Sequence, residues 1–411
     1  MLEDFIPVAA EQLRSTPLGT HLDGFCVWLS DRGYRGQTIR EKVWSVARLS
    51  RWMAAKRLGV VGLDERCVDE FDSAQRRRGR RRRGVRSTLL QLLAHLRTAG
   101  VLPAPAPVHD DSPRAALLAR YAEYLRRERA LAASTIAGYL AIVCAFVDEH
   151  LDGAARADSL RADDVRDFLV ARIGRVVPKR AQYMCTALRS FLRFLFLHAE
   201  TGVDLALAVP TVRQAHLVGV PRHMSPEDVE RLLGGCDRSS ATGRRDHAIL
   251  LLLARLGLRA GEIMALQLGD VRWREGEIVV RGKGLIHDRL PLPSDVGQAL
   301  ALYIQKDRPS GPSRHVFLCR KAPHRGFSHP SSVTTIVMRA LARAGLTPAR
   351  RGAHLLRHSL ATTMVRRGAS FAEIGQVLRH RSPNTTEIYA KLDFAALREV
   401  AMPWPVAGGA R

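Results

Sequence analysis

Apolar residues recur at spacings of three and four through much of the first 205 positions, as expected for helices with one buried face. A clear case is the set Leu188, Phe191, Leu192 and Leu195, which falls on one side of a helix. Two stretches of this kind each accommodate four helices. The pattern therefore predicts two all-helical domains in the first half of the chain.

The two helical stretches also resemble each other in sequence. Residues 25–53 align with residues 121–149 after one gap, and matched positions then lie 97 apart. The anchors at this spacing are Thr38 with Thr135, Ile39 with Ile136, Val68 with Val165, and Phe71 with Phe168. We interpret the match as an internal duplication, although helical bundles of similar size also look alike. Thr38 and Thr135 stand where the second helix of each copy is expected to begin, which favours capping hydroxyls.

Pro-rich and irregular segments divide the chain into three blocks. The segment PAPAPVHDDSP at 103–113 is typical of a linker, and a second junction runs from 206 to 224. We therefore expect structured domains at 1–102, 114–205 and 225–411.

The third block mixes two periods and is expected to be α+β. Residues 277–293, EIVVRGKGLIHDRLPLP, alternate around a Gly-Lys-Gly turn, which is typical of a β-hairpin. Ser225 before Pro226, and Ser370 three residues before Glu373, are helix N-terminal signals. The predicted helices of this block are 225–233, 246–257, 294–306, 331–344, 354–368 and 370–380.

The charge balance then indicates the kind of partner. The chain carries a net charge of +24, which points to a polyanion, either nucleic acid or an anionic membrane. The longest apolar run, at 248–254, is far too short to span a bilayer. The N-terminus MLEDFIPVAAEQL lacks a secretory signal pattern, so we expect a cytoplasmic, bacterial, nucleoid-associated protein and no membrane partner. Six cysteines without a CxxC pair argue against zinc and against a disulfide framework.

Candidate chemistry is concentrated in the third block. His354 and Arg357, at i and i+3, share one helix face, and Arg259 follows Gly257 at the mouth of another helix. The full ordered set is Arg259, Lys283 at the hairpin tip, His354, Arg357, His380, and Tyr389 nine positions after His380.

This ordered set resembles that of the tyrosine recombinases, the phage integrase family. The resemblance covers about residues 225–400 and rests on ARLGLRAGEIMAL, a hairpin lysine, HLLRHSLAT, and LRH followed by TTEIY. It implies two all-α domains followed by an α+β catalytic domain. The SAM-like core-binding domain would be 114–205, and its copy at 1–102 would be an additional DNA-binding arm.

The resemblance implies that Tyr389 attacks a DNA phosphate and forms a 3′-phosphotyrosyl link, while Arg259 and Arg357 hold that phosphate. The physical chemistry is compatible, because two guanidinium groups can clamp non-bridging oxygens and stay charged. They supply electrostatic stabilisation that other phosphoryl-transfer enzymes take from Mg²⁺. No paired carboxylates suited to metals stand out, so neither a metal nor ATP nor another cofactor is expected.

The remaining residues take supporting roles in this resemblance. Lys283 would protonate the leaving 5′ oxygen, His354 would act as acid and base, and His380 would hydrogen-bond the phosphate. Glu262 matches an acidic position that orients its neighbours. His358 is interpreted as a structural histidine. Arg379 departs from the family, where a glycine usually precedes the second histidine.

A dense basic run, QRRRGRRRRGVR at 75–86, is either a solvated loop or a surface that contacts phosphates. Its counterpart in the second copy, GRVVPKRAQ at 174–182, is also basic, which favours DNA contact. The residues expected to contact DNA are Arg76, Arg77, Arg78, Arg80, Arg81, Arg82, Arg83, Lys179 and Arg180.

The expected function is site-specific recombination of double-stranded DNA. The resemblance implies a homotetramer on DNA, with co-recombinases or a directionality factor as further partners. A terminal helix at 392–405 would dock on a neighbouring copy or pack on its own chain. The alternatives are relaxation of DNA by a type IB topoisomerase and a non-catalytic DNA-binding accessory. The duplicated arm argues against the first, and the intact set of six residues argues against the second.

Overall fold

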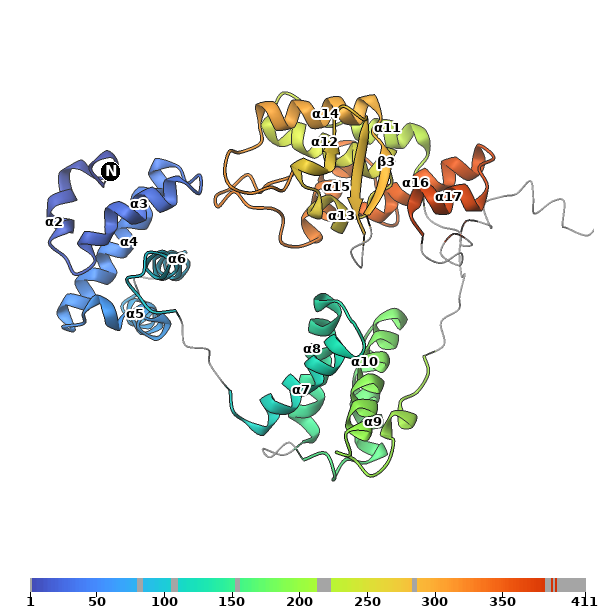
Figure 1. The fold of residues 1–411 in the computed structure, drawn as a ribbon, viewed down its shortest axis with the longest axis horizontal. Coiled ribbons are helices and arrows are strands. Elements are labelled where there is room, and N and C mark those ends of the chain that lie inside the picture. The colour runs from blue at the N-terminus through green and yellow to red at the C-terminus, as the bar shows by residue number, and fades with distance from the viewer. Residues whose placement is uncertain are drawn as a thin grey trace, which may run out of the picture. The chain divides into compact units, whose positions relative to one another are not determined.

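A computed structural model describes residues 2–79, 84–104, 110–151, 156–212, 223–282 and 287–380, together with residues 386 and 389. The chain divides into two compact units, one of residues 106–218 and one of residues 1–105 with 219–411. Helices predominate in both (Figure 1). Lys283, Arg80 to Arg83 and the expected helix at 392–405 lie outside the described residues.

The N-terminal residues form a helical bundle with its own apolar core. Phe25, Val46, Phe71 and Leu92 are fully buried in this core, and each comes from a different helix. The helices are α1 (Leu2–Phe5), α2 (Ala10–Arg14), α3 (Leu22–Ser30), α4 (Gly36–Ala55), α5 (Glu65–Arg77) and α6 (Val85–Thr98). Short 3-10 turns are η1 (Pro7–Ala9), η2 (Gly19–His21) and η3 (Val60–Gly62).

The second unit is a bundle of four longer helices with an aromatic core. Tyr121, Phe146, Phe191 and Phe194 are buried there, with the Tyr121 and Phe191 rings 5.1 Å apart in an edge-to-face arrangement. Ser112 caps the first helix by accepting a bond from the N–H of Ala115. The elements are α7 (Pro113–Arg127), α8 (Ala133–His150), α9 (Ala162–Ile173), α10 (Pro178–Leu197) and η4 (Leu205–Ala208).

Helix positions in the two bundles follow the spacing of the sequence anchors. Helices α4 and α8 begin 97 residues apart, at Gly36 and Ala133, and α5 and α9 also begin 97 apart. The capping expectation was wrong. Thr38 and Thr135 are each the third residue of a helix, and neither N-cap residue, Arg35 or Ala132, makes a side-chain capping bond.

The C-terminal residues form a helical block with a small sheet. Ser225 and Ser370 cap their helices as expected, accepting from the N–H groups of Asp228 and Glu373. The elements are α11 (Pro226–Gly234), α12 (Ala241–Arg255), α13 (Ala260–Ala265), η5 (Leu268–Asp270), α14 (Ser294–Lys306), α15 (Ser331–Arg343), α16 (Ala353–Arg366) and α17 (Phe371–Leu378).

The sheet has three antiparallel strands in the order β1 (Val271–Arg272), β2 (Glu277–Arg281) and β3 (His287–Pro291). Strands β2 and β3 pair in the register Arg281 with His287, as the predicted hairpin requires. The short strand β1 was not predicted, because two residues are too few to show an alternating pattern.

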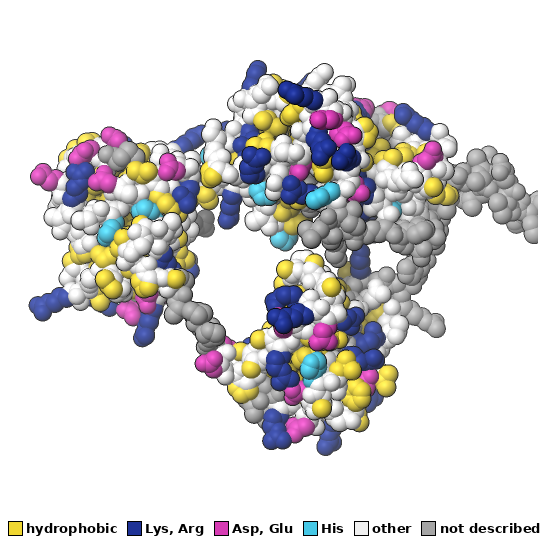
Figure 2. Space-filling view, in the orientation of Figure 1, with side chains coloured by type: hydrophobic (Ala, Val, Ile, Leu, Met, Phe, Trp, Pro, Cys, Tyr) yellow, Lys and Arg dark blue, Asp and Glu magenta, His cyan; other side chains and the backbone are white. Residues whose placement is uncertain are grey.

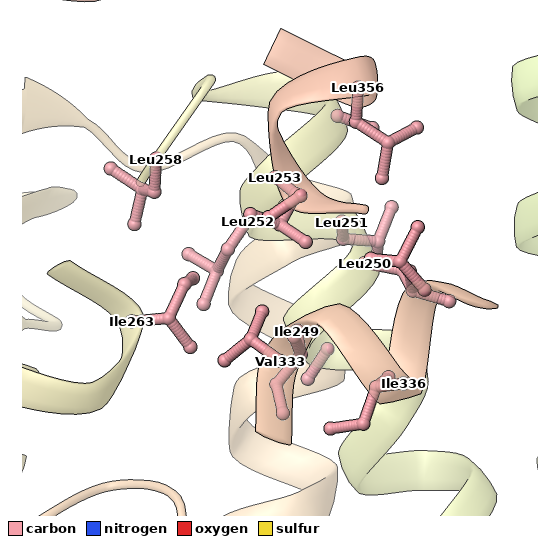
Figure 3. Packing of buried hydrophobic residues seen from close by; sticks show 14 of the residues in the cluster. Ile249, Leu250, Leu251, Leu252, Leu253, Leu258, Ile263, Val333, Ile336 and Leu356 are labelled. Carbon is pink, nitrogen blue, oxygen red and sulfur yellow. The ribbon is translucent and has the colours of Figure 1, made fainter. Parts of the chain in front are cut away.

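Helix α12 is the centre of the C-terminal core. It contacts α11, α13, α14, α15 and α16, and its residues 248–254 are all buried. Figure 3 shows the apolar side chains of α12 packed against residues such as Ile263, Val333 and Leu356. A helical segment that is apolar on every side, such as residues 248–254, is stable only when enclosed in this way. The buried α12 therefore anchors the loop that follows it, which carries Arg259.

Lys and Arg side chains lie over the visible surface of both bundles and of the C-terminal block (Figure 2). Across the described ranges, no helix is both long and apolar enough to cross a membrane. All six cysteines are free.

Candidate active site

Arg259 stands immediately before α13 and is held by the carboxylate of Glu262. Its backbone N–H donates to Oε2 of Glu262 at 2.8 Å, which satisfies a donor at the helix start. Its Nη1 donates to Oε1 of the same carboxylate at 2.7 Å. The Glu262 side chain is buried, whereas that of Arg259 is 38% exposed. The acid thus fixes one edge of the guanidinium and leaves the group accessible.

Arg357 lies on α16 and is buried. Its Nη1 donates to the carbonyl oxygen of Gly257 at 2.5 Å, and its Nη2 donates to the carbonyl oxygen of Leu378. Burial and the charges of Arg259 and Arg379 lower the pKa of Arg357 to about 10, so it remains cationic at neutral pH. Arg357 therefore joins the loop after α12 to the end of α17.

Arg379 ends α17 in the left-handed conformation, with φ 54°. Residues with a Cβ rarely adopt this conformation, which accounts physically for a glycine at such a position. Its side chain is only 6% exposed and turns inward, where Nη2 donates to Oε2 of Glu262 at 2.8 Å. Its carbonyl oxygen accepts a bond from Nη2 of Arg259 at 3.2 Å.

Three histidines surround the arginines. His354 is exposed at the start of α16, and its ring centroid lies 6.5 Å from that of His358, one turn further along. His380 follows α17, and its Nδ1 lies 2.7 Å from Oγ1 of Thr386. Burial, with the charges of Arg357 and Arg259, lowers the pKa of His380 to about 4. His380 is therefore neutral at pH 7.

Tyr389 is 1% exposed and packs in a small apolar cluster with residues of α16 and α17, including Ala361, Ile374 and Leu378. Its hydroxyl lies 2.6 Å from Nδ1 of His358. Burial raises the pKa of Tyr389 to about 12, and burial with neighbouring charge lowers the pKa of His358 to about 4. At neutral pH the phenol is therefore protonated and donates to a neutral imidazole.

The sequence-based interpretation of His358 as a structural residue missed its bond to Tyr389. Its position four residues after His354 on the same helix was the available signal, but a histidine on a partly apolar face is ambiguous. Among the residues described, no group of three or more His, Cys, Asp or Glu side chains could hold a metal ion.

The remaining predicted DNA contacts lie on the surfaces of the two bundles. Arg76, Arg77 and Arg78 are exposed at the end of α5, with Arg76 also paired to Asp72, while Lys179 and Arg180 are exposed at the start of α10. A groove of about 750 Å³ lies between α4 and the start of α6. Its lining includes Lys42, Trp44, Arg48, Arg51, Ser87 and Thr88.

The arrangement suits the binding of an oxyanion. Three guanidinium groups converge around one carboxylate, and a tyrosine hydroxyl and two neutral imidazoles lie beside them. Tyrosine is a weak nucleophile until its proton is removed or nearby positive charge stabilises the phenolate.

Comparisons with known proteins show which family the chain resembles. The sequence pattern of the Phage integrase family matches residues 222–396, and that of the Phage integrase N-terminal SAM-like domain matches residues 118–198. The integrase/recombinase y4rA of Sinorhizobium fredii is 41% identical over 395 residues, which cover 95% of each chain. Tyrosine recombinase XerD of Listeria monocytogenes is 28% identical over 297 residues, covering 69% of this chain and 96% of XerD.

Solved structures show the same fold. The XerH site-specific recombinase, bound to a palindromic difH substrate in a post-cleavage complex, superimposes with a TM-score of 0.53 at 17% identity. That match covers 95% of both chains. Together with 41% identity to y4rA over nearly the whole chain, these findings place the protein in the phage integrase family of tyrosine recombinases, a class of DNA breaking-rejoining enzymes.

Proposed function

We propose that the protein is a site-specific DNA recombinase in which Tyr389 cuts one DNA strand and forms a 3′-phosphotyrosyl intermediate, without a metal ion or ATP. The observation that carries this proposal is the convergence of Arg259, Arg357, His380 and Tyr389 from three separate segments of the chain. Bringing like charges together is costly, and a bound phosphodiester would offset that cost.

Each step of the proposed reaction is a substitution at phosphorus. The Tyr389 oxygen gives its proton to Nδ1 of His358, which lies 2.6 Å away, and forms a bond to phosphorus while the bond from phosphorus to the 5′ oxygen breaks. Lys283 gives a proton to the leaving 5′ oxygen. The free 5′-hydroxyl of a partner strand then returns a proton to Lys283 and attacks the phosphotyrosyl link, which restores a phosphodiester and releases Tyr389, protonated again by His358. Because one ester replaces another, no external energy source is required.

The arginines and histidines stabilise charge during this exchange. Arg259 and Arg357 bind the non-bridging oxygens as negative charge develops on them. His380 donates a hydrogen bond to the phosphate as a neutral imidazole. His354, exposed at the start of α16, exchanges protons with the reacting oxygens.

Duplex DNA is the proposed partner, and the working assembly is a homotetramer. Related recombinases solved with DNA, such as XerH on difH and λ integrase on a COC′ core site, support DNA as the partner. The basic ends of α5 and α10 and the groove beside α4 would follow the phosphate backbone. Such contacts add affinity without selecting a sequence.

A nicked suicide substrate tests the central claim. Wild-type protein should become covalently attached to the DNA and shift on a denaturing gel, whereas Tyr389→Phe should not. Tyr139→Phe, which removes a phenol hydroxyl from α8, is the matched control and should attach like wild type. Attachment of the Tyr389→Phe protein would overturn the assignment of the nucleophile.

A further inference from the structure

Arg379 combines two energetically unfavourable features. It adopts a left-handed backbone conformation that glycine would adopt without strain. It also buries a guanidinium whose Nε has no hydrogen-bond partner, although its side chain is only 6% exposed. An unsatisfied buried donor next to other cations is unusual and needs an explanation.

The partners of Arg379 are parts of the proposed phosphate site. Its Nη2 binds Oε2 of Glu262, while Nη1 of Arg259 binds Oε1 of the same carboxylate. Burial alone would raise the pKa of Glu262, but the charge of Arg379 and the bonds from Arg259 outweigh it and lower this pKa. Glu262 is therefore ionised and shared between two arginines.

The sharing changes the charge that faces a ligand. An isolated pair of Arg259 and Glu262 has no net charge, so its attraction for a phosphate is weak. When Arg379 also pairs with Glu262, the three groups together carry one positive charge, and Arg357 adds another. Arg259 is the most accessible of the three groups, because its side chain is 38% exposed whereas those of Glu262 and Arg379 are each 6% exposed.

We propose that Arg379 is a positioning residue for the scissile phosphate: it binds Oε2 of Glu262 and offsets the carboxylate charge, so that Arg259 faces the phosphate as an uncompensated cation. This inference rests on the proposed function. The strained backbone at Arg379 is the cost of bringing a third guanidinium to the site. A purely structural link between α13 and α17 is the rival explanation.

Two variants and a control distinguish an effect of the Arg379 charge from a purely structural effect of its side chain. Arg379→Gln keeps a polar side chain without the charge, and Arg379→Lys keeps the charge. Arg57→Gln is the control, because Arg57 has the same left-handed backbone, with φ 58°, but is exposed and lies two residues after the end of α4. Thermal melting of all three establishes that they are folded.

The first measurement is the rate of single-turnover attachment to the nicked suicide substrate. Losing a charge-assisted interaction should slow Arg379→Gln by about ten- to a hundredfold. Arg379→Lys should recover most of the rate, and Arg57→Gln should match wild type. If Arg379→Gln attaches at the wild-type rate, the inference is wrong while the proposed function stands. If wild type itself fails to attach, the proposed function fails first.

The second measurement detects the phosphate directly. In a Tyr389→Phe background, which does not cleave, DNA affinity is compared for duplexes with a phosphodiester or a neutral methylphosphonate at the scissile position. The preference for the charged phosphate should shrink when Arg379→Gln is added. An unchanged preference, or an equal loss of rate for Arg379→Lys and Arg379→Gln, would show that Arg379 is only a structural link.

Discussion

At the scale of single residues, burial gives identical side chains different chemistry. Arg259 is partly exposed, whereas Arg357 is buried and engaged with two backbone carbonyls. His358 and His380 are partly buried beside cations and are held neutral. Residue type and spacing therefore indicate which groups are candidates for the proposed site. Burial and neighbouring charge decide the protonation state of each group.

The bond between Tyr389 and His358 should be measurable as a coupling. His358→Phe leaves the buried phenol hydroxyl without its acceptor, so it should lower the free energy of unfolding by about 1–3 kcal/mol. In a Tyr389→Phe background, where the hydroxyl is absent, the same substitution should cost less. Urea denaturation of the four proteins gives the coupling, and additive effects would contradict the bond.

The neutral histidines predict a pH dependence of stability. The pKa values of His358 and His380 are about 4 in the folded protein, below the ordinary value of about 6.5 for an unfolded chain. Between these values the unfolded state binds more protons, so stability should fall as pH drops from about 6.5 to 4. The charges lowering the His358 pKa, after burial, come from His354, Arg357 and Arg350.

Denaturant midpoints measured from pH 7.5 to 4 test this dependence. A His358→Gln, His380→Gln double variant should show a flatter profile across the same window, because the two titrating groups are gone. A profile of wild-type steepness in that variant would assign the dependence to other groups.

At the scale of elements, the site depends on how α12 ends. Gly257 has φ 58°, a conformation that favours glycine, and its carbonyl oxygen accepts the bond from Arg357. A Cβ at Gly257 would lie 2.7 Å from Cδ2 of Leu378, on the helix that precedes His380. One short loop thus sets the distance between α12, α16 and α17.

Gly257→Ala should therefore cost more than backbone strain alone. Gly276, in the turn between β1 and β2, has φ 63° and nothing within 4 Å of an added Cβ. Gly276→Ala should lose about 1–2 kcal/mol of stability and keep DNA attachment. Gly257→Ala should lose more stability and slow attachment, since Leu378 must shift. Equal costs at the two glycines would show that the contact with Leu378 is unimportant.

The helices of the C-terminal block were largely predictable from sequence. Helix α14 begins and ends at the predicted residues, and Ser225 and Ser370 cap as expected, because these signals are local. Thr38 and Thr135 are not caps, because the helices begin two residues earlier, at Gly36 and Ala133, and both threonines lie inside the first turn. The exact first residue of a helix depends on tertiary packing, and the local sequence pattern does not specify it.

At the scale of the whole molecule, the high positive charge and the proposed duplication of a helical domain both fit binding to a long DNA duplex. The helix spacing of 97 residues, shared by α4 with α8 and by α5 with α9, supports our proposal that the arm duplicates the core-binding domain. A second DNA-binding bundle would lengthen the contacted duplex. The net charge of +24 is consistent with such an extended polyanion surface.

The basic run of the arm should control the salt dependence of DNA binding. Replacing Arg80, Arg81, Arg82 and Arg83 by Gln should weaken binding to any sequence, and flatten the plot of log affinity against log salt by about 0.9 per lost phosphate contact. Arg66→Gln, at the opposite end of α5 and 87% exposed, is the control. An unchanged slope in the fourfold variant would contradict phosphate contact.

The sequence by itself determined the helical character, the hairpin, the basic charge and the order of the candidate residues, because these follow from local periodicity, composition and spacing. Only the tertiary structure decided that Arg379 turns inward to Glu262 and that Tyr389 is buried against His358. These contacts join positions 117 and 31 residues apart. Side-chain direction and burial at such separations arise from packing, which no local pattern encodes.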